Sequence, residues 1–273
     1  MLSPPIRASS QAPSGRARYD ELAEAAIAGA LPGSSAGDEQ PKFAAIVDDR
    51  GGPRHLLVKF SPPRDSPAGQ RWADLLLFEH LTAQTVAAHG LTACSTSWFE
   101  SSRRVYLEVE RFDRIGLRGR AGAVSLFALD AAHRGGLDDW YSAADWLQRE
   151  GWISAGDAED LRTLWWVGRY MGNTDMHFGN VSFRLDSARP LRMLPAYDML
   201  PMHFRPAVSG EVITPPLVFP FAPPSQASAA MHGAKVALSF WSSAAGDQRV
   251  SPEMRLAASD ALRELRTTLA TRT

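Results

Sequence analysis

Residues 172–180 read GNTDMHFGN and bring an aspartate, a histidine and two asparagines into nine consecutive positions. The residues before them, 157–170, place Leu161, Leu164 and Gly168 at helical spacing. Short apolar segments at 181–185 and 191–196 favour strands after it. The segment is therefore predicted to be a polar loop that follows a helix and leads into a strand.

Within this loop, Asp175 and Asn180 are five positions apart. The catalytic loop of protein kinases has the same separation between its base aspartate and its magnesium-binding asparagine. The aspartate accepts the proton of the attacking hydroxyl, and the asparagine supplies a hard oxygen to a metal ion that neutralises phosphate charge. An ordinary polar turn after a helix can have the same spacing. Residues elsewhere in the chain must therefore decide between a catalytic loop and such a turn.

Three residues outside the loop fit the same chemistry. Asp198, in PAYDMLP (195–201), follows an apolar segment and could be the carboxylate ligand that Mg²⁺ needs. Lys59 ends the predicted strand LLVKF (56–60), like the strand lysine that pairs with nucleotide phosphates in kinases. Only three of the 29 basic residues are lysines, which gives Lys59 added weight. Glu79, on the next predicted helix, could hold Lys59 by an ion pair. The alternatives are a turn aspartate, a lysine on a solvent-facing edge strand and a surface glutamate.

Two further loops are candidates for nucleotide contacts. Residues 33–42 read GSSAGDEQPK, and their small side chains would let backbone N–H groups approach phosphate oxygens. This segment is neither a Walker A motif nor G-x-G-x-x-G, so an ordinary loop remains an alternative. Residues 110–113 follow a predicted strand, where backbone groups could hold a purine and Asp113 a ribose hydroxyl. A salt-bridged loop is the alternative there.

The order of predicted elements indicates an α+β fold. The first part of the chain is led by strands, with a helix at 19–30, a hairpin of strands at 42–47 and 54–60, a helix at 68–89 and a strand at 105–109. The remainder is led by helices, the last of which begins at Ser251-Pro252. We predict a flexible tail at 1–18, a sheet-bearing N-terminal lobe at 19–115 and a helical C-terminal lobe at 116–273.

The composition excludes several classes of protein. Hydrophobic residues make up 45% and charged residues 22% of the chain, which is typical of a globular protein and not of a disordered or fibrous one. A net charge of −1 gives no overall electrostatic attraction to nucleic acid or to an anionic membrane. The single cysteine, Cys94, favours a reducing, cytoplasmic setting. Neither a secretory signal in residues 1–18 nor a membrane-spanning helix is expected.

Five segments, in this order, make the sequence resemble the HipA-like kinases of bacterial toxin–antitoxin systems. They are SSAGDEQPKF (34–43), LLVKF (56–60), VERFDR (109–114), GNTDMHFGNVSF (172–183) and PAYDMLP (195–201). The fourth is the most specific, and together they span most of the chain. The resemblance implies a two-lobed, protein-kinase-like fold.

The resemblance also implies a role for each candidate residue. In the loop and beyond it, the implied roles are Asp175 as catalytic base, His177 as support for the loop geometry, and Asn180 and Asp198 as magnesium ligands. The implied nucleotide contacts are Lys59 with ATP phosphates, Glu79 with Lys59, the backbone of Glu110 and Phe112 with adenine, Asp113 near the ribose and Gly37 in the small-residue loop. The serine of that loop is an autophosphorylation site in this family, and Ser34 or Ser35 matches it.

As a member of this family, the protein would be an ATP- and Mg²⁺-dependent serine/threonine kinase. It would act as a toxin that phosphorylates an aminoacyl-tRNA synthetase or another translation protein and arrests growth. A helix-turn-helix antitoxin would be its partner, and no direct contact with nucleic acid is expected. Longer members carry an N-terminal subdomain that does not fit into the 33 residues before the loop. We therefore expect either a short form of the family or a C-terminal kinase unit whose missing part is a separate chain.

Other functions remain open at this point. A kinase-fold phosphotransferase acting on a small molecule would use the same residues with a different acceptor pocket. A binding module without activity would fit if Lys59, Asp175, Asn180 and Asp198 did not come together. A metal hydrolase would use Asp175, His177, Asp198 and His203 as ligands, although His203 is better explained as a structural histidine.

Overall fold

The computed structural model describes residues 6–9, 16–29, 40–49 and 52–271. By its internal contacts the chain divides into two compact units. The first unit comprises Met1–His80, Cys94–Ala121 and Pro206–Val212, and the second comprises Leu81–Ala93, Gly122–Arg205 and Ile213–Thr273. Strands dominate the first unit and helices the second, in agreement with the predicted α+β fold. The lobe boundaries predicted from the sequence remain predictions.

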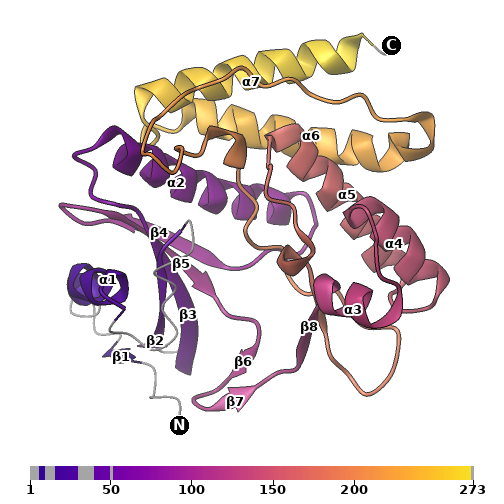
Figure 1. The fold of residues 1–273 in the computed structure, drawn as a ribbon, viewed down its shortest axis with the longest axis horizontal. Helices are drawn as coiled ribbons and strands as arrows, with labels where there is room; N and C mark the ends of the chain where they lie inside the picture. Colours follow the sequence, from indigo (N-terminus) through magenta and orange to yellow (C-terminus); the bar gives the residue numbers. More distant parts are fainter. Residues whose placement is uncertain (1–5, 10–15, 30–39, 50–51, 272–273) are drawn as a thin grey trace. The chain divides into compact units, whose positions relative to one another are not determined.

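A five-stranded sheet forms the centre of the first unit (Figure 1). Its spatial order is β1 (Ile6–Ser9), β2 (Lys42–Asp49), β3 (Gly52–Phe60), β5 (Val105–Glu110) and β4 (Thr96–Glu100). The predicted hairpin is confirmed, since β2 pairs antiparallel with β3 from Lys42 opposite Lys59 to Asp49 opposite Gly52. Because β5 pairs with the other side of β3, Lys59 lies on an internal strand and not on an edge.

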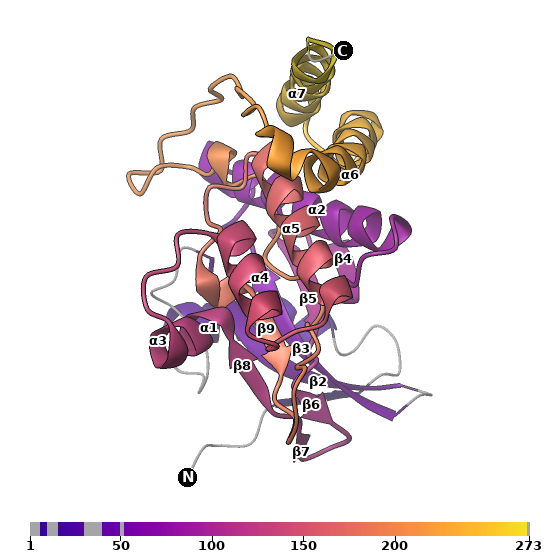
Figure 2. The same ribbon diagram turned by 90° about the vertical axis from the view of Figure 1, so that its right-hand side faces the viewer.

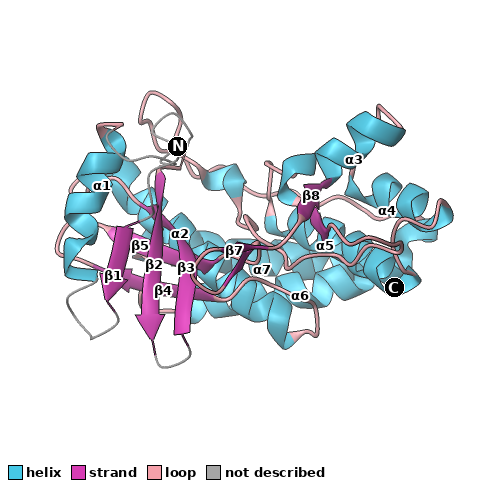
Figure 3. Ribbon diagram, turned by 90° about the horizontal axis from the view of Figure 1, so that it is seen from below, coloured by secondary structure: helices cyan, strands magenta, loops and turns pink. Residues whose placement is uncertain are grey.

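Helix α1 (Tyr19–Ile27) covers one face of this sheet (Figure 3). Its buried residues Tyr19, Leu22, Ala23 and Ala26 recur at i, i+3, i+4 and i+7, the spacing of an amphipathic helix that presents one face to a core. The Tyr19 ring packs edge-on against Phe43 of β2, and its hydroxyl donates to Glu108 over 3.0 Å. The hydroxyl of this large buried side chain is thereby satisfied.

The stretch 1–18, expected to be a flexible tail, contains two short ordered elements. β1 pairs parallel with β2, and residues 16–18 form a 3₁₀ turn whose Arg16 donates two hydrogen bonds to Glu108. Composition alone did not reveal these elements, because their order comes from contacts with the distant β2 and β5.

The second unit is built mainly from helices that pack side by side (Figure 2). Its elements are the C-terminal part of α2 (Pro67–Ala88), α3 (Leu126–His133), α4 (Trp140–Arg149), α5 (Ala155–Met171), α6 (Ala227–Gly246), α7 (Pro252–Ala270) and the two-stranded pair β8 (Ala123–Ser125) and β9 (Ser182–Arg184). Helix α7 begins as predicted, because the Ser251 hydroxyl caps it by accepting from the Met254 N–H and proline occupies its first turn. None of the helices in the described ranges has both the length and the apolar character needed to cross a bilayer.

One predicted strand is wrong. Residues 191–196 do not form a strand but make three isolated bridges, Leu191 with Ile153, Met193 with Phe183 and Ala196 with Ala93. Each bridge reaches a different segment, so no continuous ladder forms. An apolar run predicts burial, which Leu191 and Leu194 show, but it does not say whether one partner strand is available.

Close packing between α5 and α6 depends on Gly233. A β-carbon at this position would lie 2.7 Å from Cβ of Trp166 and 2.9 Å from the backbone nitrogen of Val167. Gly246, in the last turn of the same helix, has no atom within 4 Å of the corresponding point. Gly246 can therefore serve as the control position for a substitution at Gly233.

We expect Gly233→Ala to lower the free energy of unfolding by about 1–3 kcal/mol, because the helices must separate. The better helix propensity of alanine, about 1 kcal/mol, offsets this only in part. Gly246→Ala should be neutral or stabilising, since it gains propensity without a clash. Urea unfolding of both variants checks this, and equal stabilities would contradict the close packing.

Candidate active site

The loop at 172–180 begins where α5 ends. Gly172 takes a left-handed conformation with φ of 69°, which glycine adopts without strain and which reverses the chain. The Asn173 N–H then bonds back to the Gly168 carbonyl over 2.9 Å. The buried Asn173 side chain accepts from the Asp175 N–H over 3.0 Å. Asp175 itself is exposed at this turn, as a base that receives a proton from a substrate must be.

Three side chains hold carbonyl groups of the loop. The Asn180 Nδ2 donates to the Asp175 carbonyl over 3.0 Å, and the Trp140 Nε1 donates to the His177 carbonyl over 3.2 Å. The Tyr197 hydroxyl donates to the Gly179 carbonyl over 2.7 Å. A loop outside helix and sheet must find such partners for its backbone. Each of these bonds therefore helps to fix the loop in one conformation.

His177 stabilises the loop from within. Its Nδ1 accepts a hydrogen bond from the Gly179 N–H over 3.0 Å and so caps the short 3₁₀ turn at 178–180. The role that the resemblance implies for His177, support of the loop geometry, stays a prediction.

Asp198 has an unusual backbone. Its φ of 55° makes it the one non-glycine residue with a positive φ in the described ranges. Aspartate tolerates this region better than most residues, but the conformation still costs free energy and persists only where the surroundings impose it. Residues held in this way are often found at functional sites.

The donor atoms of Asn180 and Asp198 suit magnesium. Within the described part of the chain, the Asn180 side chain makes its hydrogen bond through Nδ2, which leaves the amide oxygen as the atom that can ligate a metal. Mg²⁺ binds through one or two protein oxygens together with phosphates and water, so these two residues fit such a site. No group of three or more His, Cys, Asp or Glu side chains in the described ranges could hold a metal by itself.

His203 has a structural environment, as expected. Its Nε2 lies 3.2 Å from the Pro215 carbonyl, and its ring packs edge-on against Phe204. The metal hydrolase required this side chain as a ligand, and its contacts give no support to that role.

Lys59 and Glu79 form a buried ion pair in the first unit. The Lys59 Nζ lies 2.6 and 2.8 Å from the two carboxylate oxygens of Glu79. Lys59 is 3% and Glu79 4% exposed, so neither is the surface residue that the alternatives proposed. A buried pair of this kind places the ammonium at a defined point of β3, and removal of one partner from such a pair is strongly destabilising.

The segment after β5 is more constrained than the sequence suggested. The Glu110 N–H donates to the Ser95 carbonyl over 2.9 Å, so a backbone contact from Glu110 to a purine would use its carbonyl. Arg111 holds both oxygens of Asp113 at 2.8 Å, and Arg114 also bonds this carboxylate. Burial acts to raise the pKa of Asp113, but the bonds and charges of the two arginines outweigh it and lower the pKa below its ordinary value. A ribose hydroxyl at Asp113 would therefore compete with Arg111.

Three predicted residues, Gly37, Ser34 and Ser35, lie outside the described residues. Of the others, the structure brings Asp175, His177 and Asn180 together in one loop and pairs Lys59 with Glu79. Sequence analysis missed Trp140 and Tyr197, which hold the loop. Trp140 is far from the loop in sequence and carried no signal, whereas the position of Tyr197 beside Asp198 was visible but suggested no role.

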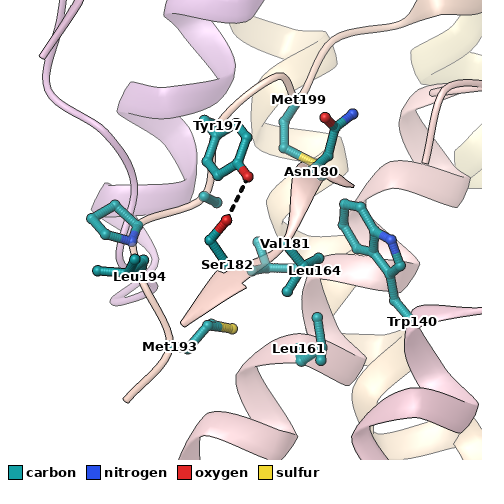
Figure 4. A pocket seen from close by; sticks show the side chains of 12 residues that line it. Trp140, Leu161, Leu164, Asn180, Val181, Ser182, Met193, Leu194, Tyr197 and Met199 are labelled. Atoms are coloured by element: carbon teal, nitrogen blue, oxygen red, sulfur yellow. Dashed lines mark hydrogen bonds between the residues drawn. The ribbon is translucent and has the colours of Figure 1, made fainter. Parts of the chain in front are cut away.

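A small cavity of about 10 Å³ lies next to the loop (Figure 4). Figure 4 shows Asn180, Ser182, Tyr197 and Met199 around it, with Trp140 on the side of α4. The cavity has room for about one water molecule. It is thus a packing feature under the loop and is too small to bind a nucleotide.

Comparison with known proteins bears on the family and the fold of the chain. The family model of the HipA-like C-terminal domain matches residues 26–268. Toxin YjjJ of Escherichia coli (strain K12) is 37% identical over 238 residues, which cover 87% of this chain and 54% of that protein. The chain thus spans about half the length of this curated relative.

Two solved structures share the fold. HipA from the complex of Shewanella oneidensis MR-1 HipA, HipB and operator DNA superposes with a TM-score of 0.57 at 15% identity, covering 86% of this chain and 65% of that one. The Helicobacter pylori proinflammatory kinase CtkA superposes with a TM-score of 0.54 at 13% identity, covering 86% and 90%. The predicted kinase-like α+β fold is confirmed by these neighbours, and the match to the family model together with the identity to a curated toxin shows that the chain belongs to the HipA-like C-terminal domain family.

Proposed function

We propose that the protein is an ATP- and Mg²⁺-dependent serine/threonine kinase that acts as the toxin of a toxin–antitoxin pair. The observation that carries this proposal is the loop at 172–180, in which Asp175 is exposed and the Asn180 amide oxygen is left available by its own Nδ2 bond. Membership of a toxin family and the fold shared with a kinase support it.

In this proposal each residue has one chemical task. Asp175 accepts the proton of the substrate hydroxyl as that oxygen attacks the terminal phosphoryl group. Asn180 and Asp198 hold the magnesium ion, which, when bound, neutralises negative charge on the phosphates. Lys59, fixed by Glu79, donates to phosphate oxygens. His177 keeps Gly179 and Asn180 in place through its Nδ1.

The residues that contact the nucleotide base, and the serine that is autophosphorylated, are proposed from the family resemblance. We propose that the Glu110 carbonyl and the Phe112 backbone hold adenine, that Asp113 lies near the ribose and that Gly37 lies near the phosphates. Ser34 or Ser35 would be the autophosphorylation site. The substrate would be an aminoacyl-tRNA synthetase or another translation protein, and the partner a helix-turn-helix antitoxin. An antitoxin is supported by the HipA neighbour, whose structure includes HipB and operator DNA.

Incubation with γ-labelled ATP and Mg²⁺ tests the activity directly. We expect wild-type protein to transfer label to Ser34 or Ser35 and to a translation protein in a lysate, as mapped by mass spectrometry. Asp175→Asn should reduce transfer by at least about a hundredfold, the range expected for a lost general base. Asp186→Asn, the same change at an exposed aspartate of the same unit, should leave it unchanged.

Label found only in small molecules would instead favour the small-molecule phosphotransferase. No transfer from wild-type protein, with both serines unmodified at the outset and no ATP binding by calorimetry, would contradict the kinase proposal.

Variants of the Lys59–Glu79 ion pair can separate its effect on the stability of the protein from its effect on ATP binding. Lys59→Met should lower the free energy of unfolding by about 3–5 kcal/mol, because it takes the ammonium away from the buried Glu79 carboxylate. The double variant Lys59→Met/Glu79→Met replaces the pair by apolar side chains and should recover most of that loss. Chemical denaturation measures both.

ATP affinity should not recover in the double variant, because the phosphate-binding ammonium is still missing. Calorimetric titration of ATP into wild-type and double-variant protein checks this. A double variant that is stable and binds ATP as tightly as the wild type would show that Lys59 has only a structural role.

A further inference from the structure

One phenol hydroxyl connects two segments of the second unit, residues 179–182 and the segment that contains Tyr197. Tyr197 donates to the Gly179 carbonyl over 2.7 Å, and its oxygen lies 2.8 Å from the Ser182 hydroxyl (Figure 4). Because the single Tyr197 proton is used for Gly179, Ser182 must be the donor in the second bond. The Tyr197 oxygen is thus fixed by two hydrogen bonds, one on each side of Asn180 in the sequence.

The positions of these residues in the chain are the important point. Gly179 immediately precedes Asn180, and Tyr197 immediately precedes Asp198. A single hydrogen bond therefore joins the residue before one proposed magnesium ligand to the residue before the other. The backbone bond from the Leu194 N–H to the Ser182 carbonyl, 2.9 Å, holds the same two segments together nearby.

The surroundings strengthen this connection. Apolar side chains of Val181, Leu194 and Met199 line the adjacent cavity, which has a volume of only about 10 Å³. Ser182 is buried and both bonds of the Tyr197 hydroxyl are partly buried, so water competes for them less than at the surface. Replacing Tyr197 by phenylalanine would remove the hydroxyl and keep the ring that fills this space.

The Asp198 backbone gives a reason for such a link. A positive φ at a non-glycine residue persists only where neighbouring contacts impose it. Mg²⁺ demands nearly ideal octahedral geometry, so a small shift of one ligand relative to the other weakens its binding.

We infer that Tyr197 is a positioning residue for the metal site: its hydroxyl sets Asp198 relative to Asn180, and Ser182 holds that hydroxyl in place. The inference rests on the proposed function, because it assigns Tyr197 a task at the same metal site. Tyr197 does not touch the nucleotide in this account and acts through the two ligands.

The test compares nucleotide binding with and without metal. A non-hydrolysable ATP analogue is titrated into each protein by calorimetry, once with Mg²⁺ and once with EDTA. We expect Tyr197→Phe to bind about fivefold more weakly than wild type with Mg²⁺, the value of one ordinary hydrogen bond, and equally well in EDTA. Electron paramagnetic resonance can measure the Mn²⁺ concentration that half-saturates the complex with the analogue. In Tyr197→Phe this concentration should rise by a similar factor.

Two further variants sharpen the comparison. Ser182→Ala removes only the second bond and should weaken Mg²⁺-dependent binding by a smaller factor, about twofold. It also decides the question if Tyr197→Phe does not fold. Tyr141→Phe, which removes an exposed hydroxyl 3.5 Å from the Ser225 carbonyl, should leave both titrations unchanged.

The outcomes distinguish this inference from the proposed function. Equal Mg²⁺ enhancement in wild type and Tyr197→Phe, or an equal loss with Mg²⁺ and with EDTA, would overturn the positioning role alone. If wild-type protein bound no nucleotide under either condition, the proposed function would fail and the inference with it.

Discussion

The polar backbone of the loop at 172–180 needs partners that neither helix nor sheet provides. Its carbonyl groups at Asp175, His177 and Gly179 are satisfied by side chains from three places: the end of the loop itself, α4 and the segment before Asp198. Because an unpaired carbonyl would cost free energy, these bonds make the loop conformation a property of the whole helical unit. The exposed Asp175 and the buried Asn180 are both placed by this arrangement.

The ion pair of Lys59 and Glu79 is the corresponding constraint in the first unit. The chain uses arginine at nearly every basic position, yet the side chain at this position is a lysine. A lysine ammonium is a compact charge on a flexible stem, whereas the planar arginine fork needs more room and several acceptors. Burial of the pair is costly unless the geometry is good, which the two short contacts to Glu79 provide. A charge held in this way is suited to a task beyond stability.

Much of this could be predicted from the sequence, where local patterns carried the information. The 172–180 loop, the β2–β3 hairpin, the amphipathic α1 and the start of α7 each follow from spacing or from capping residues. Contacts between distant segments could not be predicted in the same way. Trp140 and Tyr197 reach the loop only because α4 and the segment before Asp198 fold against it. The strand predicted at 191–196 is wrong for the same reason, because its apolar pattern indicates burial but does not identify a partner strand. The salt bridge between Arg111 and Asp113 is local, and a salt-bridged loop was one of the two alternatives for residues 110–113.

The proposed function depends most on the pairing of Asn180 and Asp198 as ligands of one magnesium ion. The most direct measurement is a crystal structure with Mn²⁺ in place of Mg²⁺ and a non-hydrolysable ATP analogue, in which anomalous scattering locates the metal. We expect manganese bound to the Asn180 amide oxygen and the Asp198 carboxylate. Nucleotide bound elsewhere, or manganese that touches neither residue, would contradict this expectation.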